Sequence, residues 1–323
     1  MNILVGTAGF SYPDWKGIVY PSDLKKRKIH ELEYLAQFFE CCEINNSFYR
    51  PLDPKVARRW CEYVAPVNER FQFTAKLTQV FTHAPMARTT SSSAETIKYT
   101  NQDVEEAKAG FDPLMEAARL ATVLLQFPIS YKYTEGNWDH LIDVAHLFKD
   151  YPVAVEVRHE SWADPLVLKA LEEERLAFCN IDQPRLRGTL EGTKYVTAPV
   201  GYMRLHGRNY QKWFQGKNRD ERYNYLYSER ELDSITRKVQ EMSEQAKKTI
   251  VIANNHYKGQ AAVNAIDLKR LLGVKNNPVP IELQTAYPRL GGDAPVKPPK
   301  CEGSSASKTS PKQTSTSQSS LFD

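Results

Sequence analysis

The amino-acid sequence predicts a single (β/α)8 barrel of the triosephosphate-isomerase type, followed by a disordered C-terminal tail. Short apolar segments alternate with longer amphipathic segments roughly eight times along the chain. That alternation is typical of parallel strands joined by crossover helices. An eightfold repeat favours a closed barrel over an open doubly wound sheet, and no GxGxxG turn follows an early strand.

Eight apolar segments are expected to form the strands of the barrel. They are Ile3–Val5, Cys42–Ile44, Phe71–Ala75, Thr122–Gln126, Val153–Val157, Ala177–Ile181, Tyr202–Leu205 and Ile250–Ala253. Amphipathic patterns between and after them predict helices. The predicted helices are His30–Cys41, Pro54–Val64, Asp112–Ala121, Trp138–Lys149, Pro165–Glu174, Ser228–Lys247 and Gln260–Leu272.

The composition predicts one folded domain and one tail. The chain has 323 residues, of which 41% are hydrophobic, and this is enough for a single sizeable core over residues 1–290. From about Gly291 onward the sequence is rich in Ser, Thr, Pro and Lys. Such a segment buries too little apolar surface to offset the entropy of ordering, so residues 291–323 are expected to be disordered.

Charge and cysteine content exclude several classes of protein. The net charge of +4 means that any nucleic-acid contact would need a local basic face. The five cysteines are odd in number and include no CxxC pair, which disfavours a disulfide framework and a cysteine-based zinc site. No apolar run approaches the ~18 residues of a membrane span, and no signal peptide precedes the first strand. The sequence therefore predicts a cytoplasmic protein without a membrane partner.

Polar side chains gather at the predicted carboxyl ends of the strands, where barrels of this type carry their chemistry. Carboxylates and imidazoles that could transfer protons there are Glu43, Glu156, Asp182, His206 and His256. Groups that could hold phosphate or carboxylate oxygens are Lys76, Arg158, His159, Arg204, Arg208, Asn254 and Asn255. A structural ion-pair network across the barrel mouth is the alternative interpretation of these residues.

A divalent metal is a candidate cofactor at this rim. Histidine and carboxylate side chains could bind Mn²⁺, Mg²⁺ or Zn²⁺. However, no HExxH or comparable short ligand pair occurs, and four nearby cationic side chains would repel a metal dication. The metal thus remains an open alternative.

Two predicted loops are rich in aromatic residues. GFSYPDWKGIVYP follows the first strand and carries Tyr12 and Trp15, and HGRNYQKWFQGKNRDERYNYLYS follows the seventh and carries Tyr210 and Trp213. Aromatic faces stack on bases or sugars, while Lys and Arg follow phosphates, so these loops indicate nucleic-acid binding. A packed lid over the barrel mouth is an equally weighted alternative.

Several longer motifs resemble those of the YecE-like family, the domain-of-unknown-function family 72. The motifs are GTAGFSYPDWKG, EINNSFYR, FTAKLTQVFTH, EVRHESW, YMRLHGR and NNHYKGQAAVNA, and they span about residues 3–265. The resemblance implies a barrel fold. It also implies that the rim residues form the functional face, but it assigns none of them a role.

The tail ends in a pattern with one apolar pair, Gln318-x-x-Leu321-Phe322. This is similar to the short motif by which bacterial repair proteins and polymerases bind the sliding clamp, where the Leu–Phe pair fills an apolar pocket. An apolar pair at the tip of a polar tail is typical of a docking peptide, so the bacterial sliding clamp is an expected partner. Only three positions are specified, which leaves a chance match as the alternative.

The leading hypothesis is an enzyme that acts on a phosphate-bearing substrate, including nucleic acid in a nuclease-like or repair-like reaction. In it, Lys76, Arg158 and Arg204 hold anionic oxygens. Glu156 or Glu43 serves as base, and the proton donor is His206 or His256. A sugar or sugar-phosphate isomerase or lyase would use the same acids and bases. A non-catalytic module that binds a ligand or nucleic acid would use only the rim.

Overall fold

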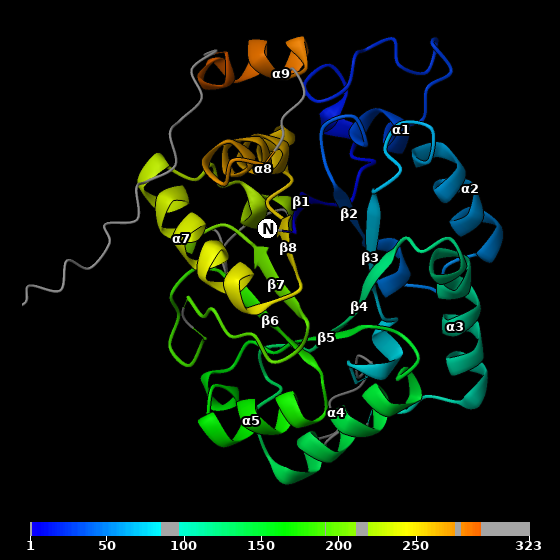
Figure 1. Cartoon of the computed structure of the whole chain (residues 1–323), viewed down its shortest axis with the longest axis vertical. Coiled ribbons are helices and arrows are strands. Elements are labelled where there is room, and N and C mark those ends of the chain that lie inside the picture. Colours follow the sequence, from blue (N-terminus) through cyan, green and yellow to red (C-terminus); the bar gives the residue numbers. More distant parts are fainter. Residues whose placement is uncertain (1, 85–96, 191, 211–218, 275–278, 292–323) are drawn as a thin grey trace, which may run out of the picture.

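The chain forms a closed barrel of eight parallel strands (Figure 1). The computed structural model describes residues 2–84, 97–190, 192–210, 219–274 and 279–291. The strands are β1 (Ile3–Ala8), β2 (Cys41–Ile44), β3 (Gln72–Lys76), β4 (Leu120–Gln126), β5 (Val153–Glu156), β6 (Ala177–Asp182), β7 (Val200–Leu205) and β8 (Lys248–Ala253). Each strand pairs with the next, and β8 pairs with β1 to close the barrel. The predicted barrel is confirmed, whereas residues 292–323 of the predicted tail lie outside the described residues.

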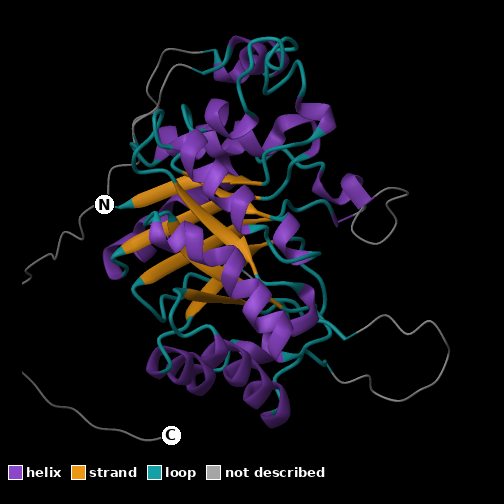
Figure 2. Ribbon diagram, turned by 90° about the vertical axis from the view of Figure 1, so that its right-hand side faces the viewer, coloured by secondary structure: helices purple, strands orange, loops and turns teal. Residues whose placement is uncertain are grey.

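Helices surround the strands, which run in one direction through the middle of the molecule (Figure 2). They are α1 (Glu31–Leu35), α2 (Pro54–Val64), α3 (Asn101–Glu116), α4 (Glu135–Leu147), α5 (Pro165–Glu173), α7 (Glu229–Gln245), α8 (Gln260–Leu271) and α9 (Ile281–Ala286). Two of them begin alike, because Asp53 and Asp164 accept a hydrogen bond from the new helix and proline follows at its first position. Both features favour a helix start.

The helix before β4 begins earlier than predicted. The sequence indicated Asp112–Ala121, whereas α3 spans Asn101–Glu116 and Leu120 already belongs to β4. A capping box starts this helix: the Thr100 hydroxyl accepts from the Asp103 N–H, and the Asp103 carboxylate accepts from the Thr100 N–H. The prediction starts too late because it relies on large apolar residues, and the first turns of α3 carry few of them.

The first predicted helix, His30–Cys41, is also too long. In the structure α1 spans Glu31–Leu35, and Cys41 opens β2. The Glu40 N–H already donates to the Val5 carbonyl, so at this point the chain follows the barrel wall. Pairing with β1 therefore overrides the helical pattern of the residues before Cys41.

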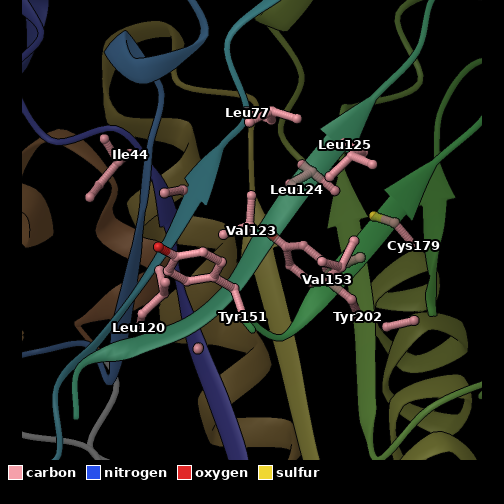
Figure 3. Close-up of a cluster of buried hydrophobic side chains, with 14 of the residues drawn as sticks. Ile44, Leu77, Leu120, Val123, Leu124, Leu125, Tyr151, Val153, Cys179 and Tyr202 are labelled. Atoms are coloured by element: carbon pink, nitrogen blue, oxygen red, sulfur yellow. The ribbon is translucent and has the colours of Figure 1, made fainter. Parts of the chain in front are cut away.

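The apolar core lies between the strands and the surrounding helices. One buried cluster joins strands β2 to β6 to the helices outside them, and Figure 3 shows part of it, including Ile44, Leu124 and Cys179. A second cluster joins β1, β7 and β8 to α7 and α8. These layers fix the strands, so that the side chains at the strand ends have fixed positions.

Two further findings bear on the predicted class of protein. In the part of the chain that the structure describes, no helix has the length and apolar character needed to cross a membrane. Cys41, Cys42, Cys61 and Cys179 are buried free thiols, and Cys301 lies outside the described residues.

Replacement of Gly6 tests the close packing of β1 against β2. A Cβ atom at this position would lie 1.8 Å from the Cys41 carbonyl oxygen, so the backbone would have to move. We expect Gly6→Ala to lower the free energy of unfolding by about 1–3 kcal/mol or more, as overpacked cores do. Urea unfolding followed by circular dichroism measures it.

Gly136→Ala is the matched control for this measurement. Gly136 lies in the first turn of α4 with no heavy atom within 4 Å of the added carbon. The control should raise the free energy of unfolding by up to about 0.5–1 kcal/mol, since alanine loses less conformational entropy. An unchanged urea midpoint for Gly6→Ala would contradict the close approach of the two strands.

Candidate active site at the barrel mouth

A buried arginine connects strands on opposite sides of the barrel. Arg204 Nη2 donates to Glu43 Oε1 at 2.6 Å, and Nη1 donates to Glu156 and, at 3.2 Å, to Gln126 Oε1. The side chains of Arg204, Glu43 and Glu156 are fully buried. They come from β7, β2 and β5, which are not neighbours, so the ion pairs cross the barrel interior.

Both oxygens of Glu43 have partners. Oε2 accepts from the Tyr202 hydroxyl at 2.7 Å, and that hydroxyl lies 3.0 Å from Thr74 Oγ1. Oε1, which accepts from Arg204, lies 3.8 Å from Lys76 Nζ. The carboxylate is therefore held by two short hydrogen bonds and a longer ion pair.

Glu156 is bound by cations on two sides. Besides Arg204, Arg158 donates to Oε1 through Nε at 2.8 Å and Nη2 at 2.6 Å. His206 Nε2 lies 3.6 Å from the same oxygen, which is too far for a hydrogen bond. Its Nδ1 lies 2.9 Å from the Asn254 amide nitrogen, an arrangement that assigns the imidazole proton to Nε2. Burial lowers the pKa of His206 to about 4, so the ring is neutral at pH 7.

The cations keep both buried carboxyl groups ionised. Burial opposes ionisation of Glu43, but Arg204 and Lys76 outweigh it and hold the pKa below its ordinary value. Burial likewise opposes ionisation of Glu156, and there Arg204 and Arg158 hold the pKa well below the ordinary value. At neutral pH the network thus contains two carboxylates rather than neutral acids.

A cavity of about 410 Å³ lies at the carboxyl ends of the strands. This volume falls in the range of about 300–1,000 Å³ that is usual for small-molecule sites. Among the described residues, its charged lining consists of Lys76, Arg158, Arg222 and His256 if protonated, with Asp14 as the sole carboxylate. Lys76 and Arg158 also belong to the buried network, so the network forms a support for part of the cavity wall.

Aromatic rings form another part of the cavity wall. Tyr12 stacks on His256 with ring centroids 4.3 Å apart, and Tyr223 lies 5.0 Å from the same imidazole. The Tyr12 hydroxyl donates to the Ala8 carbonyl at 2.6 Å. Trp15 is fully buried, and its indole N–H donates to the His256 carbonyl at 2.7 Å. Trp15 therefore supports the wall from behind, whereas Tyr12 lines the cavity.

A second ion-pair cluster holds the loop after β7. Arg208 donates to both oxygens of Asp182, at 2.8 and 2.6 Å, and to Glu231 at 3.2 Å. The Tyr227 hydroxyl donates to Asp182 as well, at 2.7 Å. The Asn209 amide donates to two carbonyls near the other end of the loop, those of Glu221 and Asn224. These contacts anchor the loop that supplies Arg222 and Tyr223 to the cavity.

Two other predicted binding residues stabilise loops instead of lining the cavity. His159 Nδ1 accepts from the Ser161 N–H at 3.2 Å and so caps a short 3₁₀ helix, Glu160–Trp162. The Asn255 amide donates to the Tyr225 carbonyl. Asn254 differs from both, because its side chain lines the cavity beside His206.

Some predicted residues do not join the site that the structure describes. Tyr210 is 64% exposed and does not line the cavity. Trp213 lies outside the described residues, as do the tail residues Gln318, Leu321 and Phe322. Nucleic-acid binding by the loop and clamp binding by the tail stay predictions.

The described residues contain no group of three or more His, Cys, Asp or Glu side chains placed to hold a metal ion. Glu43 and Glu156, the most central acids, are paired with guanidinium groups. The candidate Mn²⁺, Mg²⁺ or Zn²⁺ therefore finds no ligand set in this part of the chain.

Sequence reasoning missed Tyr202, which bonds Glu43 from inside the barrel. A signal for it exists, because side chains two residues apart in a strand share a face, and Tyr202 precedes Arg204 by two. It also missed Phe48, which lines the cavity, and it included Arg222 and Tyr223 only as members of the aromatic and basic loop after the seventh strand. They come from loops, and only the folded chain shows which loop residues turn inward.

With this geometry in place, the chain can be compared with known proteins. The model of the family DUF72, described as a protein of unknown function, matches residues 4–289. The chain belongs to the DUF72 family. The resemblance seen in the sequence motifs is thereby confirmed.

Relatives of the DUF72 chain share its whole barrel. YunF of Bacillus subtilis, a UPF0759 protein, is 28% identical over 283 residues, which is 84% of this chain and 95% of its own. A solved DUF72 structure from Thermotoga maritima is 33% identical, with a TM-score of 0.70, over 84% of this chain and 100% of its own. One from Enterococcus faecalis is 26% identical, with a TM-score of 0.71, over 86% and 98%.

Removal of the central cation tests the buried network. Arg204→Met leaves two buried carboxylates without their shared partner, so we expect the free energy of unfolding at pH 7 to fall by about 3–5 kcal/mol. Arg27→Met is the control, because Arg27 pairs with Asp23 on the surface, where such a change costs at most about 1 kcal/mol. Urea unfolding of the variants and the parent protein gives both values.

The same variant has an expected pH dependence. In the parent protein the pKa values of both carboxyl groups lie below the ordinary 4.5, so their stabilising contribution is lost as the pH falls through those values. Without Arg204, only Lys76 and Arg158 oppose the effect of burial, so both pKa values rise and protonation relieves the cost of the less well paired charges. The stability difference between parent and variant should therefore shrink as the pH is lowered from 7 toward 4. A constant difference would mean that the carboxylates do not depend on Arg204.

Proposed function

We propose that this DUF72 barrel is an enzyme that acts on a small phosphate-bearing substrate held in the cavity at the barrel mouth. The observation that carries the proposal is the charge of the cavity wall. Lys76, Arg158 and Arg222 line it against the one carboxylate of Asp14, counted over the described residues. Cations around a small concave volume focus a positive potential and attract a phosphate dianion.

Arg158 is suited to anchor the phosphate. Its Nε and Nη2 both bond Glu156, which fixes the plane of the guanidinium, while no hydrogen bond to a described residue uses Nη1. A guanidinium oriented in this way can donate to a phosphate oxygen with little further ordering. Asp14 competes weakly, because its carboxylate already accepts from the Lys258 N–H at 2.6 Å.

Glu43 and Glu156 fit a positioning role better than the role of general base. Both are fully buried beneath the cavity and share their charge with Arg204. A carboxylate with a pKa below its ordinary value is a weak base at pH 7. We assign proton transfer instead to Lys76 and His256, whose side chains line the cavity.

A nucleic-acid substrate is the second candidate, and Tyr49 favours it. This side chain lines the cavity and is 54% exposed, and aromatic side chains at such sites stack on bases. A cavity of about 410 Å³ suits a strand end or a flipped nucleotide rather than a duplex. A nucleic-acid substrate would then place a single nucleotide in the cavity.

Calorimetric titration separates the candidates. The full chain is titrated with inorganic phosphate, a triose phosphate, a nucleoside monophosphate and a short single-stranded DNA over a salt series. We expect binding of the small phosphate compounds and at least a tenfold loss of affinity in Arg158→Gln and in Arg222→Gln, since each removes a charge-assisted contact. Arg27→Gln, a surface variant at a residue that does not line the cavity, should bind as the parent does.

The outcomes of this titration have distinct meanings. Binding of DNA alone, lost in Arg222→Gln, would favour the nucleic-acid candidate. If no phosphate compound bound at low salt, or if Arg158→Gln bound every compound as tightly as the parent, the proposal would be overturned.

We also propose that the end of the chain docks on a bacterial sliding clamp, which would place the protein in the cytoplasm. The support is the pattern Gln318-x-x-Leu321-Phe322 in a segment of otherwise polar residues outside the described part of the chain. A labelled peptide of residues 310–323 should bind a purified bacterial clamp in a polarisation assay. The Leu321→Ala/Phe322→Ala peptide should not, because it lacks the apolar anchors. If a peptide of scrambled sequence bound the clamp with the same affinity, the motif would not be the reason for binding.

A further inference from the structure

We propose that Lys76 is a nucleophile that forms an imine with the carbonyl group of a phosphorylated aldehyde or ketone. This rests on the proposed function, because the other cations of the cavity must hold the phosphate. It goes further in naming the substrate class and the bond that the protein makes.

The contacts of the Lys76 amine differ from those of a structural lysine. Its side chain is 12% exposed and lines the cavity; Nζ lies 3.8 Å from Glu43 Oε1 and 5.8 Å from the centroid of the Phe48 ring. Among the described residues, no group accepts a hydrogen bond from it. Lys269 is the contrast, since its buried amine donates to Glu40 at 2.5 Å and to the Phe38 carbonyl. A structural lysine such as Lys269 donates its hydrogen bonds to the protein, whereas the amine of Lys76 can donate to a ligand.

The charges of the network make the ammonium group of Lys76 easier to deprotonate. Glu43 and Glu156 carry two negative charges, and Lys76, Arg158 and Arg204 would carry three positive ones. Guanidinium groups keep their protons in proteins, so the amine is the group that can remove the excess. Burial, together with the charge of Arg204, lowers the pKa of Lys76 to about 8, and roughly a tenth of the amine is then neutral at pH 7.

The reaction needs no oxidant or reductant. The lone pair of the neutral amine attacks the carbonyl carbon and a C–N bond forms, while the π electrons move to the oxygen. A proton passes from nitrogen to that oxygen to give a carbinolamine. One further proton on the hydroxyl group lets water leave, and the nitrogen lone pair forms the C=N bond of an iminium ion. Amine, carbonyl and one proton thus become iminium and water.

The surroundings of Lys76 suit each stage. The iminium ion carries its positive charge close to where the ammonium charge was, so Glu43 stabilises it at a similar distance. Arg158 and Arg222 remain available for the phosphate. Because Arg204 joins Glu43 to Glu156, the amine and the phosphate anchor Arg158 are held at a fixed spacing. An iminium ion draws electrons from the adjacent carbon, which leads to isomerase or lyase chemistry.

Reductive trapping tests the proposal. The full chain is incubated with dihydroxyacetone phosphate and sodium cyanoborohydride, which is stable near neutral pH and reduces an iminium ion, rather than the free ketone, to a stable secondary amine. We expect one adduct per chain by intact mass spectrometry, mapped by peptide analysis to Lys76, with a yield that rises from pH 6 to pH 8 as the amine loses its proton. Lys76→Arg should lose the adduct and keep the circular dichroism spectrum of the parent.

Two other lysines show whether modification requires the cavity or only a lowered amine pKa. Lys248 also has a pKa lowered by burial, but its amine donates to Gln72 Oε1 at 2.5 Å and does not line the cavity. It should remain unmodified, as should Lys269. Arg158→Gln should reduce trapping of dihydroxyacetone phosphate at least tenfold at low concentration, whereas Arg27→Gln, a surface variant outside the cavity wall, should trap it as the parent does.

The outcomes distinguish this proposal from the one on which it rests. If calorimetry shows binding of the triose phosphate but no adduct forms at Lys76, the imine is overturned and phosphate binding stands. If neither occurs, both proposals fall. An adduct that persists in Lys76→Arg, or that is spread over exposed lysines in proportion to their exposure, also overturns the imine.

Discussion

The ion pairs of Arg204 are the constraint on which the barrel mouth depends. A single guanidinium pairs with carboxylates from β2 and β5, and Tyr202 completes the hydrogen bonding of one of them. Buried carboxylates are costly unless they are paired, so the arrangement is stable only when all its members are present. It forms a polar layer beneath the cavity, and its carboxylates pair with Lys76 and Arg158 at the cavity wall.

In that layer the acidic and the basic side chains have different roles. The acids hold cations in place, and the cations present their remaining donors, or their amine, to the cavity. The aromatic wall of Tyr12 and His256 limits the opening from the other side. A site that holds a small anionic molecule in one orientation needs lining side chains that are themselves held by fixed partners. The buried ion pairs supply those partners here.

Much of this could be predicted from the sequence. The alternation of apolar and amphipathic segments predicts the barrel, and the barrel rule brings Glu43, Lys76, Glu156 and Arg204 together at one end. Their partners could not be derived in the same way, because a contact such as Arg204 to Glu43 depends on strand tilt and side-chain reach. His159 shows the limit clearly: its position at a strand end is correctly located, yet its ring caps a local turn. Loop residues such as Tyr223 have no periodic pattern to follow.

The anchoring of the loop after β7 affects which parts of the cavity wall can change independently. Asn209 ties the start of this loop to its end, and the Arg208–Asp182 pair fastens it to the barrel independently of the Arg204 network. Exchanges of Arg222 or Tyr223 between these anchors would therefore alter the cavity wall without removing a member of the Arg204 network. A change confined to this segment would alter which molecules fit the cavity and leave the ion pairs beneath it intact.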